Sequence, residues 1–335
     1  MRCISFVIAI LAVFIFTGCS SKQYFEPEKT YRAPTHSYSG TIVNLSRDGG
    51  TLKNGNYIGK SGINKINLGK GYRFLSENNK YVLATNVKGV LKVISKKSKR
   101  PVHTLSLDIP VVSASIKNGV IAYILNNNTF GLYKIASKKK LIESPSEVTY
   151  AIDTRAPSPI FIDNLAVMPM LDGKLIIVDI YNTDNAKVVY LSSYKSFNNI
   201  IYLSRVGNTL ISSTSKKIMT LGDSGQHEYH ANISEVASTH RNIYLFTKEG
   251  KIIRLNQTLK ILSEKKFKFS HFSVATTYNN RVYALDQKGS LIVLSADLNK
   301  YKIYDIGEVK NPAFVAGSKL YKDGKVIDLS KLGYE

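Results

Sequence analysis

Residues 281–294 read RVYALDQKGSLIVL, and this stretch decides the fold that the sequence predicts. Two short runs rich in apolar and β-branched residues, Val282–Leu285 and Ser290–Leu294, flank the sequence Gln287–Gly289. Runs of this length on either side of a glycine-containing turn are typical of a β-hairpin. Glycine suits such a turn because it adopts positive φ values at little cost. We therefore expect two antiparallel strands that meet at Gly289.

The same unit recurs along the chain, with a period of about 40 residues. The glycines at the corresponding turns are Gly89, Gly131, Gly173, Gly250, Gly289 and Gly324. The interval between Gly173 and Gly250 is a double one, and we place the missing hairpin at Ser215–Lys217. An incomplete first unit spans Tyr57–Ile66, with its turn near Ser61–Gly62.

A repeat of this length, with about four short strands in each unit, is the signature of β-propeller blades. Blades bury their faces against one another, and closing the ring protects the strand edges. We expect an all-β fold, a single propeller of seven or eight four-stranded blades over residues 40–335. Thr41–Leu45 is expected to pair with the C-terminal unit and so close the ring. A long β-sandwich or a β-solenoid is the structural alternative.

The N-terminus has the features of a bacterial secretory leader. Arg2 supplies a positive charge, Ile4–Phe16 is almost unbroken apolar sequence, and small residues precede Cys19. An apolar stretch of about 13 residues is short for a transmembrane helix. We expect residues 1–18 to be a signal peptide. The alternative is that Cys19 has no role in processing: the segment is then an ordinary signal peptide, and its cleavage site lies near a cysteine by chance.

The stretch Phe16-Thr17-Gly18-Cys19 resembles the lipobox of bacterial lipoproteins. The resemblance implies that the Cys19 sulfur receives a diacylglycerol and that Cys19 becomes the acylated N-terminus. Two or three acyl chains anchor a protein stably. Ser20 and Ser21 lack the aspartate that retains lipoproteins at the inner membrane of enterobacteria, which favours outer-membrane attachment facing the periplasm. Residues 19–39 are polar with two prolines, and we expect the lipidated cysteine and a flexible tether there.

The amino-acid composition restricts the chemistry available to the chain after the leader is removed. Once the leader with Cys3 is removed, Cys19 is the only cysteine, so disulfides, thiolate metal ligands and cysteine nucleophiles are excluded. The net charge is +22, and most of the basic residues are lysine. This charge is either a solvated basic surface or an attraction to an anionic envelope component. No motif supports nucleic acid as a partner. Lysine runs at residues 96–100 and 138–140 each follow a blade's third predicted strand, so we expect one basic rim.

The blade pattern resembles the PQQ-like propeller repeat, whereas WD40 repeats fit less well because the chain has no tryptophan. Together with the lipobox, the chain resembles the BamB family, the propeller lipoproteins of the outer-membrane β-barrel assembly machine. The resemblance implies a non-enzymatic periplasmic scaffold that contacts an assembly subunit and aids barrel assembly. The alternative is a propeller that binds anionic lipid or polysaccharide, or a surface-exposed adhesin-like propeller.

Few residues are candidates for catalysis or ligand binding. PQQ enzymes dock tryptophans between blades, and this chain has none, so we expect no cofactor and no enzyme activity. His227 and His230, with His240 following, form the closest histidine group. Strand alternation places positions 227 and 230 on opposite faces, which favours a solvated edge over a metal site.

The remaining candidates lie in and beside one blade. Asp153, Asp163, Asp172 and Asp179 cluster there, and turn chemistry explains them better than acid–base catalysis. Residues 151–159 carry two prolines and read as an ordered loop between blades. Within this loop, Arg155 is a candidate contact for an acidic partner.

Overall fold

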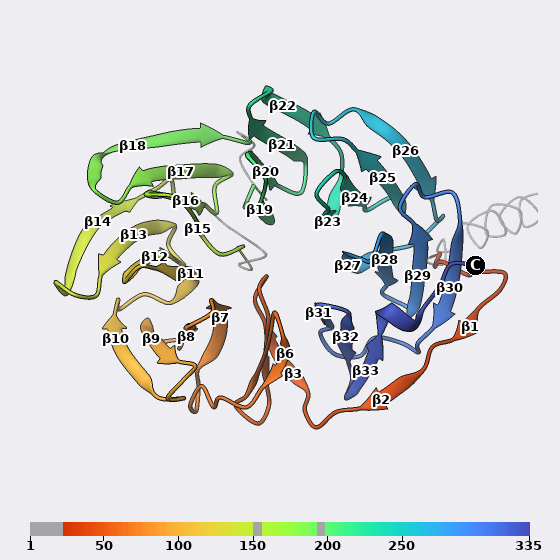
Figure 1. The fold of residues 1–335 in the computed structure, drawn as a ribbon, viewed down its shortest axis with the longest axis horizontal. Coiled ribbons are helices and arrows are strands. Elements are labelled where there is room, and N and C mark those ends of the chain that lie inside the picture. The colour runs from red at the N-terminus through yellow and green to blue at the C-terminus, as the bar shows by residue number, and fades with distance from the viewer. Residues whose placement is uncertain (1–22, 150–155, 193–197) are drawn as a thin grey trace, which may run out of the picture.

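The computed structural model describes residues 23–149, 156–192 and 198–335, which form a ring of blades (Figure 1). The innermost strands of several blades line a central channel. Eight sheets make up the ring, each of four strands except one with a fifth. This confirms the predicted all-β propeller and sets the number of blades at eight. In these ranges the one helix is the short 3-10 turn η1 (Leu329–Lys331), and no helix is long and apolar enough to cross a membrane.

The first four blades take their strands in chain order from the channel outward. Blade 1 contains β3 (Ile42–Leu45), β4 (Gly50–Leu52), β5 (Tyr57–Gly59) and β6 (Gly62–Asn64). Blade 2 contains β7 (Arg73–Glu77), β8 (Tyr81–Thr85), β9 (Val90–Ser95) and β10 (Pro101–Ser106). Blade 3 contains β11 (Val111–Lys117), β12 (Val120–Leu125), β13 (Thr129–Lys134) and β14 (Lys139–Pro145). Blade 4 contains β15 (Ile160–Ile162), β16 (Leu165–Pro169), β17 (Lys174–Asp179) and β18 (Asn182–Tyr190).

The last four blades follow the same order, but two of them take a further strand from the N-terminus. Blade 5 contains β19 (Tyr202–Val206), β20 (Thr209–Ser213), β21 (Lys217–Gly222) and β22 (Gly225–His230). Blade 6 contains β23 (Ile233–Ser238), β24 (Ile243–Thr247), β25 (Lys251–Leu255) and β26 (Ile261–Lys266). Blade 7 contains β27 (Phe272–Tyr278), β28 (Arg281–Asp286), β29 (Ser290–Ser295), β30 (Tyr301–Asp305) and, outermost, β1 (Tyr31–Arg32). Blade 8 contains β31 (Phe314–Ala316), β32 (Lys319–Lys322), β33 (Lys325–Asp328) and β2 (Thr35–Ser37).

An apolar cluster lies between each pair of neighbouring blades. Val82 and Ala84 of β8 belong to the cluster shared with Tyr57 of blade 1. Leu83, which lies between them in sequence, belongs to the cluster shared with Ile121 of blade 3. Successive side chains of a strand point to opposite faces, so a strand between two blades is buried on both sides. This two-sided burial explains the unbroken apolar runs that the sequence showed, and each buried leucine contributes about 1.5–3 kcal/mol.

The ring closes through the N-terminal segment, but not through the strand that the sequence predicted. β2 pairs antiparallel with β33, and Thr35 lies opposite Ile327. Ile42–Leu45, expected to close the ring, is instead the innermost strand of blade 1. The prediction was wrong because it looked for an apolar strand, whereas all three residues of β2 are exposed on the outer edge.

The stretch expected to be a flexible tether, residues 19–39, is therefore structured over part of its length. β1 pairs parallel with β30, with Tyr31 opposite Tyr304. Before β1, Phe25 packs edge-to-face on Phe267, with ring centroids 5.8 Å apart. The ordered chain thus begins well before residue 40, the predicted start of the propeller.

Two of the predicted turns, in blades 3 and 1, differ from the observed ones. The hairpin placed at Ser215–Lys217 is confirmed, since it joins β20 to β21. Gly131, however, lies inside β13, and the positive φ of that hairpin belongs to Asn128 (64°). A Cβ at Gly131 would overlap the ring of Tyr123, so packing rather than turn geometry requires glycine there.

In the first blade, the predicted turn was assigned to the wrong pair of strands. The turn near Ser61–Gly62 joins the third and fourth strands, and the second and third strands meet around Gly55 (φ 83°). Three of the four strands in this blade have only three residues, which leaves too little sequence for an alternating pattern to identify them.

The turns divide the surface into two faces. Turns between first and second strands and between third and fourth strands lie at one mouth of the channel, which we name the AB face. Turns between second and third strands, together with the links from blade to blade, lie at the other mouth, the BC face. Both lysine runs, at residues 96–100 and 138–140, begin in third-to-fourth turns of blades 2 and 3. They share the AB face, as expected for a basic rim.

Candidate functional site: a lysine-lined hollow on the AB face

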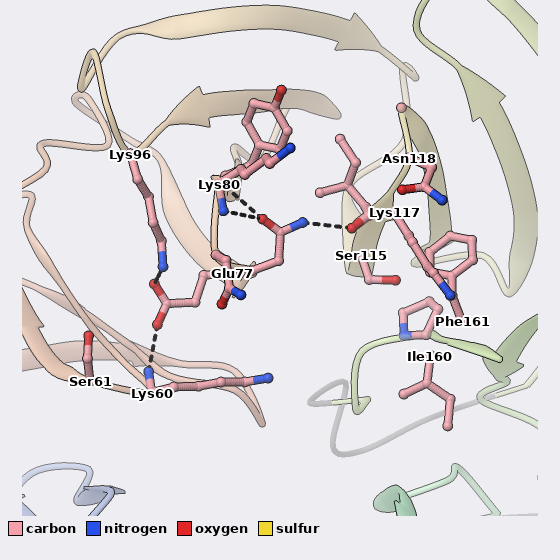
Figure 2. Close-up of a pocket in the computed structure, with 16 residues that line it drawn as sticks. Lys60, Ser61, Glu77, Lys80, Lys96, Ser115, Lys117, Asn118, Ile160 and Phe161 are labelled. Carbon is pink, nitrogen blue, oxygen red and sulfur yellow. Dashed lines mark hydrogen bonds and ion pairs between the residues drawn. The ribbon is translucent and has the colours of Figure 1, made fainter. Parts of the chain in front are cut away.

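A large hollow lies on the AB face, between blades 1, 2, 3 and 4 (Figure 2). Its volume is about 780 Å³. Four lysines line it, Lys60, Lys80, Lys96 and Lys117, against a single carboxylate, Glu77. The hollow therefore carries an excess of positive charge.

The turns of successive blades place these lysines. Lys60 lies in the third-to-fourth turn of blade 1, and Lys96 follows the third strand of blade 2. Lys80 lies in the first-to-second turn of blade 2, and Lys117 ends the first strand of blade 3. All four turns belong to the AB face, so the repeat brings together lysines that are far apart in sequence.

Glu77 organises one wall of the hollow. Its side chain is 3 % exposed and lies 2.6 Å from the Lys96 amine. The Tyr57 hydroxyl donates a hydrogen bond to it at 2.9 Å, and the backbone N–H of Lys60 donates another at 2.7 Å. Burial, followed by the charge of Glu77, raises the pKa of Tyr57, so Tyr57 stays a neutral donor. A buried carboxylate satisfied by three donors fixes both lysine-bearing turns.

Asn78 holds the next turn. Its side-chain oxygen accepts hydrogen bonds from the backbone N–H groups of Lys80 and Tyr81, both at 2.8 Å. Its amide nitrogen donates to the carbonyl of Ile116 in blade 3 at 2.8 Å. The turn that carries Lys80 is thus tied to its own blade and to the next one, which limits its movement.

The remaining lysines keep their charge uncompensated. The Lys117 amine donates to the backbone carbonyl of Asp163 at 3.2 Å, a neutral acceptor. Among the described residues, the amines of Lys60 and Lys80 have neither a hydrogen bond nor an ion pair. Figure 2 shows Lys60 below Glu77 and Lys117 on the opposite side, next to Phe161. The Ser115 hydroxyl, buried at the same site, has no partner among the described side chains and backbone groups.

The hollow continues toward the channel. A smaller space of about 330 Å³ shares Lys60, Glu77 and Ser115 with it and extends to Asp48 and Arg205. Within the channel, a third space of about 440 Å³ is lined by the innermost strands of several blades. The smaller space thus lies between the lysine-lined hollow and the channel, since it shares lining residues with both.

This arrangement suits the binding of an anionic group. Three lysines without a carboxylate partner attract a negative charge, and the asparagine and serine groups offer hydrogen bonds. The apolar side chains of Ile160 and Phe161 line the same hollow and can contact a carbon skeleton. Within the described ranges, no three His, Cys, Asp or Glu side chains lie close enough to hold a metal ion.

The residues singled out from the sequence lie elsewhere or outside the described ranges. Cys19, Asp153 and Arg155 are outside them. His227 and His230 lie on β22, the outermost strand of blade 5, where the intervening Glu228 pairs with Lys217 at 2.9 Å.

The three described aspartates occupy turns, as turn chemistry predicts, and do not converge. Asp163 has a φ of 50° in the first-to-second turn of blade 4. Asp172 lies on the BC face and pairs with Lys174 at 3.2 Å. Asp179 lies back on the AB face, where hydrogen bonds from the Tyr181 backbone and from Asn164 lower its pKa.

Sequence reasoning found the basic rim but missed the hollow. Glu77 and Ser115 carried no signal of their own, because they occur singly in strands of different blades. The asparagine–lysine turns at Asn79–Lys80 and Lys117–Asn118 were visible as repeat units, and only the curvature of the ring brings them together.

Comparison with known proteins gives relatives and a fold, but no family. No protein-family profile matches the chain. Two plasminogen-binding proteins PgbB, from two strains of Helicobacter pylori, are each 28% identical to it over 98% of this chain. The alignment covers 70% of one relative and 69% of the other.

Solved structures agree on the fold at low sequence identity. BamB from Moraxella catarrhalis superposes with a TM-score of 0.64 at 13% identity, covering 89% of this chain and 98% of that one. Sqt1 from Saccharomyces cerevisiae superposes with a TM-score of 0.63 at 9% identity, with the same coverage of both chains. The chain therefore has a BamB-like propeller fold, and it is similar over nearly its whole length to plasminogen-binding proteins.

Proposed function

We propose that this chain is a non-enzymatic binding protein of a bacterial envelope, lipid-anchored through Cys19, whose rigid ring holds a partner protein against the AB face. The observation that carries the proposal is the group of uncompensated lysines around a preformed hollow. Charges held by rigid turns bind a partner at a lower entropic cost than charges on mobile loops.

Plasminogen is the first candidate partner, because the similarity to plasminogen-binding proteins extends over 98% of this chain. The proposed contact is between acidic groups of that protein and Lys60, Lys80 and Lys117. A surface-exposed binding protein of this kind corresponds to the adhesin-like alternative that the sequence left open.

The test is a direct measurement of plasminogen binding by surface plasmon resonance. The variant K60Q/K80Q/K117Q removes the uncompensated charges, and K53Q/K88Q/K187Q removes three exposed lysines from elsewhere on blades 1, 2 and 4. We expect the first variant to bind about tenfold or more weakly, and the second to bind like the unchanged chain. Equal affinities for both variants, or no binding by the unchanged chain, would refute the proposal.

A subunit of the β-barrel assembly machine is the second candidate, favoured by the resemblance of the repeats and lipobox to BamB and supported by the shared fold. Crosslinking and pull-down of the lipidated chain from membranes should then recover that subunit. Normal levels of outer-membrane porins in a deletion strain would count against this role.

An anionic lipid or polysaccharide is the third candidate, suggested by the net charge of +22. Binding of that kind would weaken steeply as salt is raised, since exposed charges are screened.

Mass spectrometry of the N-terminal peptide tests the proposed acylation of Cys19. Fractionation of the envelope tests the proposed outer-membrane location and which side the protein faces.

A further inference from the structure

Aromatic rings and lysines gather around blade 7, on its outer edge and the adjoining part of the BC face. Four rings there are partly exposed: Tyr24 (40 %), Tyr31 (37 %), Phe269 (37 %) and Tyr301 (43 %). A lysine amine lies over each ring: Lys29 and Lys302 over Tyr31 at 5.2 and 4.2 Å, Lys265 over Tyr301 at 4.8 Å, Lys268 over Phe269 at 4.9 Å, and Lys288 over Tyr24 at 4.5 Å. We name these nine residues the rim patch.

The rim patch is continuous because the N-terminal segment lies along it. Phe25 packs on Phe267, and Phe267 packs edge-to-face on Tyr301 at 5.2 Å. Figure 1 shows β1 running along the outside of blade 7, where it pairs with β30. Residues from blade 6, blade 7 and the N-terminal segment therefore present one surface. It runs from the outer edge of blade 7 (Tyr31, Tyr301) onto the BC face (Phe269, Lys288), away from the AB hollow.

The rim patch itself holds five lysines and no carboxylate. The basic side chains in and beside it are Lys29, Arg32, Lys265, Lys266, Lys268, Lys288, Lys300 and Lys302. The acidic ones are Glu26, Glu28, Glu264, Asp297, Asp305, Glu308 and Glu335, the last with the C-terminal carboxylate. Glu264 is paired with Lys251 of its own blade at 3.2 Å. Basic and acidic groups around the patch are nearly balanced, so the five lysines of the patch itself are what favour an anionic partner.

The chain upstream of the rim patch is short. Five peptide steps separate Cys19 from Tyr24, and five extended residues span at most about 17 Å. An acyl group on Cys19 would therefore hold Tyr24 within about 17 Å of the bilayer surface. No other part of the ring is tied to the membrane so closely, because Phe25 and β1 fix the N-terminal segment to blade 7.

We propose that the rim patch is a membrane-contact surface that lies in the headgroup layer of an anionic bilayer. Tyrosine rings are enriched at this depth, since one end is apolar and the other polar. Lysine stems lie along apolar surface while their amines reach lipid phosphates. The proximity argument rests on the proposed acylation of Cys19, but the affinity of the rim patch for lipid does not.

Contact through the rim patch sets the orientation of the ring. Because the patch includes Phe269 and Lys288 on the BC face, the BC mouth is tilted toward the membrane and the AB mouth is tilted away from it. The AB hollow, on blades 1 to 4, lies away from the bilayer and stays accessible to a protein partner.

The first experiment measures the rim patch without the lipid anchor. The chain from Ser20 onward contains every strand of the ring and has no cysteine. Its sedimentation with vesicles of equal parts phosphatidylglycerol and phosphatidylcholine gives a partition coefficient. We expect K29Q/K265Q/K268Q/K288Q/K302Q to lower it by about tenfold or more. The control K53Q/K88Q/K97Q/K139Q/K187Q makes the same change of charge on blades 1 to 4.

Equal loss in both variants would mean that only net charge matters, and it would overturn the proposal. A second pair of substitutions tests the rings: Y24S with F269N, in which asparagine suits the positive φ at position 269 (64°). This pair should weaken sedimentation even at high salt. Urea midpoints equal to that of the unchanged chain show that each variant is folded.

The second experiment uses the full lipidated chain. Acylation blocks the Cys19 sulfur, so an introduced K268C or K97C is the one thiol that a nitroxide reagent can label. We expect a nickel-chelating lipid to relax the label at position 268 and not the label at position 97. Equal relaxation at both positions would overturn the proposed orientation. Labelling of the unsubstituted chain would show instead that Cys19 is not acylated, in which case the vesicle measurement alone decides whether the rim patch binds lipid.

Discussion

Arg47 and Glu235 form an ion pair across the central channel. One terminal nitrogen of the Arg47 guanidinium lies 3.2 and 3.3 Å from the two carboxylate oxygens of Glu235. Arg47 follows the first strand of blade 1, and Glu235 lies in the first strand of blade 6, so the pair joins blades that are not neighbours. Their side chains are 16% and 22% exposed. The pair links two sides of the ring, as does the hydrogen bond that the Ser158 backbone N–H donates to Asp48 at 3.3 Å.

Breaking this pair should destabilise the whole ring. We expect R47M or E235Q to lower the free energy of unfolding by about 1–2 kcal/mol, between the values for exposed and buried pairs. The double variant should lose less than the sum of the two single losses. Urea unfolding of all four proteins measures this, and strictly additive losses would show that the pair contributes no coupling.

Gly59 is expected to be intolerant of alanine. A Cβ there would overlap the carboxylate of Glu77, the residue that fixes the wall of the hollow. We expect G59A to cost about 1–3 kcal/mol by overpacking. It should also weaken binding of the partner, because the pair between Glu77 and Lys96 is displaced. In the control G333A the nearest atom lies 3.9 Å away, and its urea midpoint should not change. Equal midpoints for both variants would contradict this reading.

Part of the acid sensitivity of the fold is expected to come from Glu228. The hydrogen bond from Lys217, at 2.9 Å, lowers the pKa of Glu228 in the folded protein. The stabilisation is therefore present above the unfolded pKa, about 4.3, and disappears as the pH falls through the lowered folded value. Because a third of the Glu228 side chain is exposed, we expect only about 0.2–1 kcal/mol.

Urea midpoints measured from neutral pH down to about pH 3 test this expectation. E228Q should lose less stability on acidification than the unchanged chain. Glu28, an exposed residue without an ion pair among the described residues, supplies the control E28Q. If acidification lowers the urea midpoint of E228Q as much as that of the unchanged chain, the pair between Lys217 and Glu228 does not contribute to the acid sensitivity.

The N-terminal strands should be essential for a closed ring. A chain that begins at Gly40, the boundary that the sequence suggested, lacks β2 and leaves β33 as an open edge. We expect it to be less stable by about 2–4 kcal/mol and prone to association through that edge. A chain that begins at Ala33 keeps β2 and loses only β1, so it should remain monomeric. Size-exclusion chromatography and urea unfolding separate the two outcomes.

The repeat made most of the fold predictable. The hairpins of blades 4, 6 and 7 could be read from the sequence because their second and third strands are buried on both faces, as in Val282–Leu285. The outermost strands carried no such signal. Thr35–Ser37 is exposed along its whole length, so its role in closing the ring depends on a partner strand nearly 300 residues away.

The candidate site was predictable only as a tendency toward positive charge. The lysine runs indicated the correct face, since each follows the third strand of its blade. The hollow itself depends on the angle between blades, which brings Lys60, Lys80 and Lys117 to one place. No local pattern encodes that angle, because it results from the packing of large side chains such as Tyr57 on Phe74 between sheets.

Blade 8 is built from both ends of the chain: Thr35–Ser37 from the start, and the strands of residues 314–328 from the end. If the chain is exported from its N-terminus, β2 crosses the membrane early, whereas its partner β33 crosses after every other strand that the structure describes. Until β33 arrives, the nascent ring keeps two unpaired strand edges, at which other chains can add. The time needed for translocation, rather than the intrinsic folding rate of a blade, then determines how long these strand edges stay exposed to aggregation.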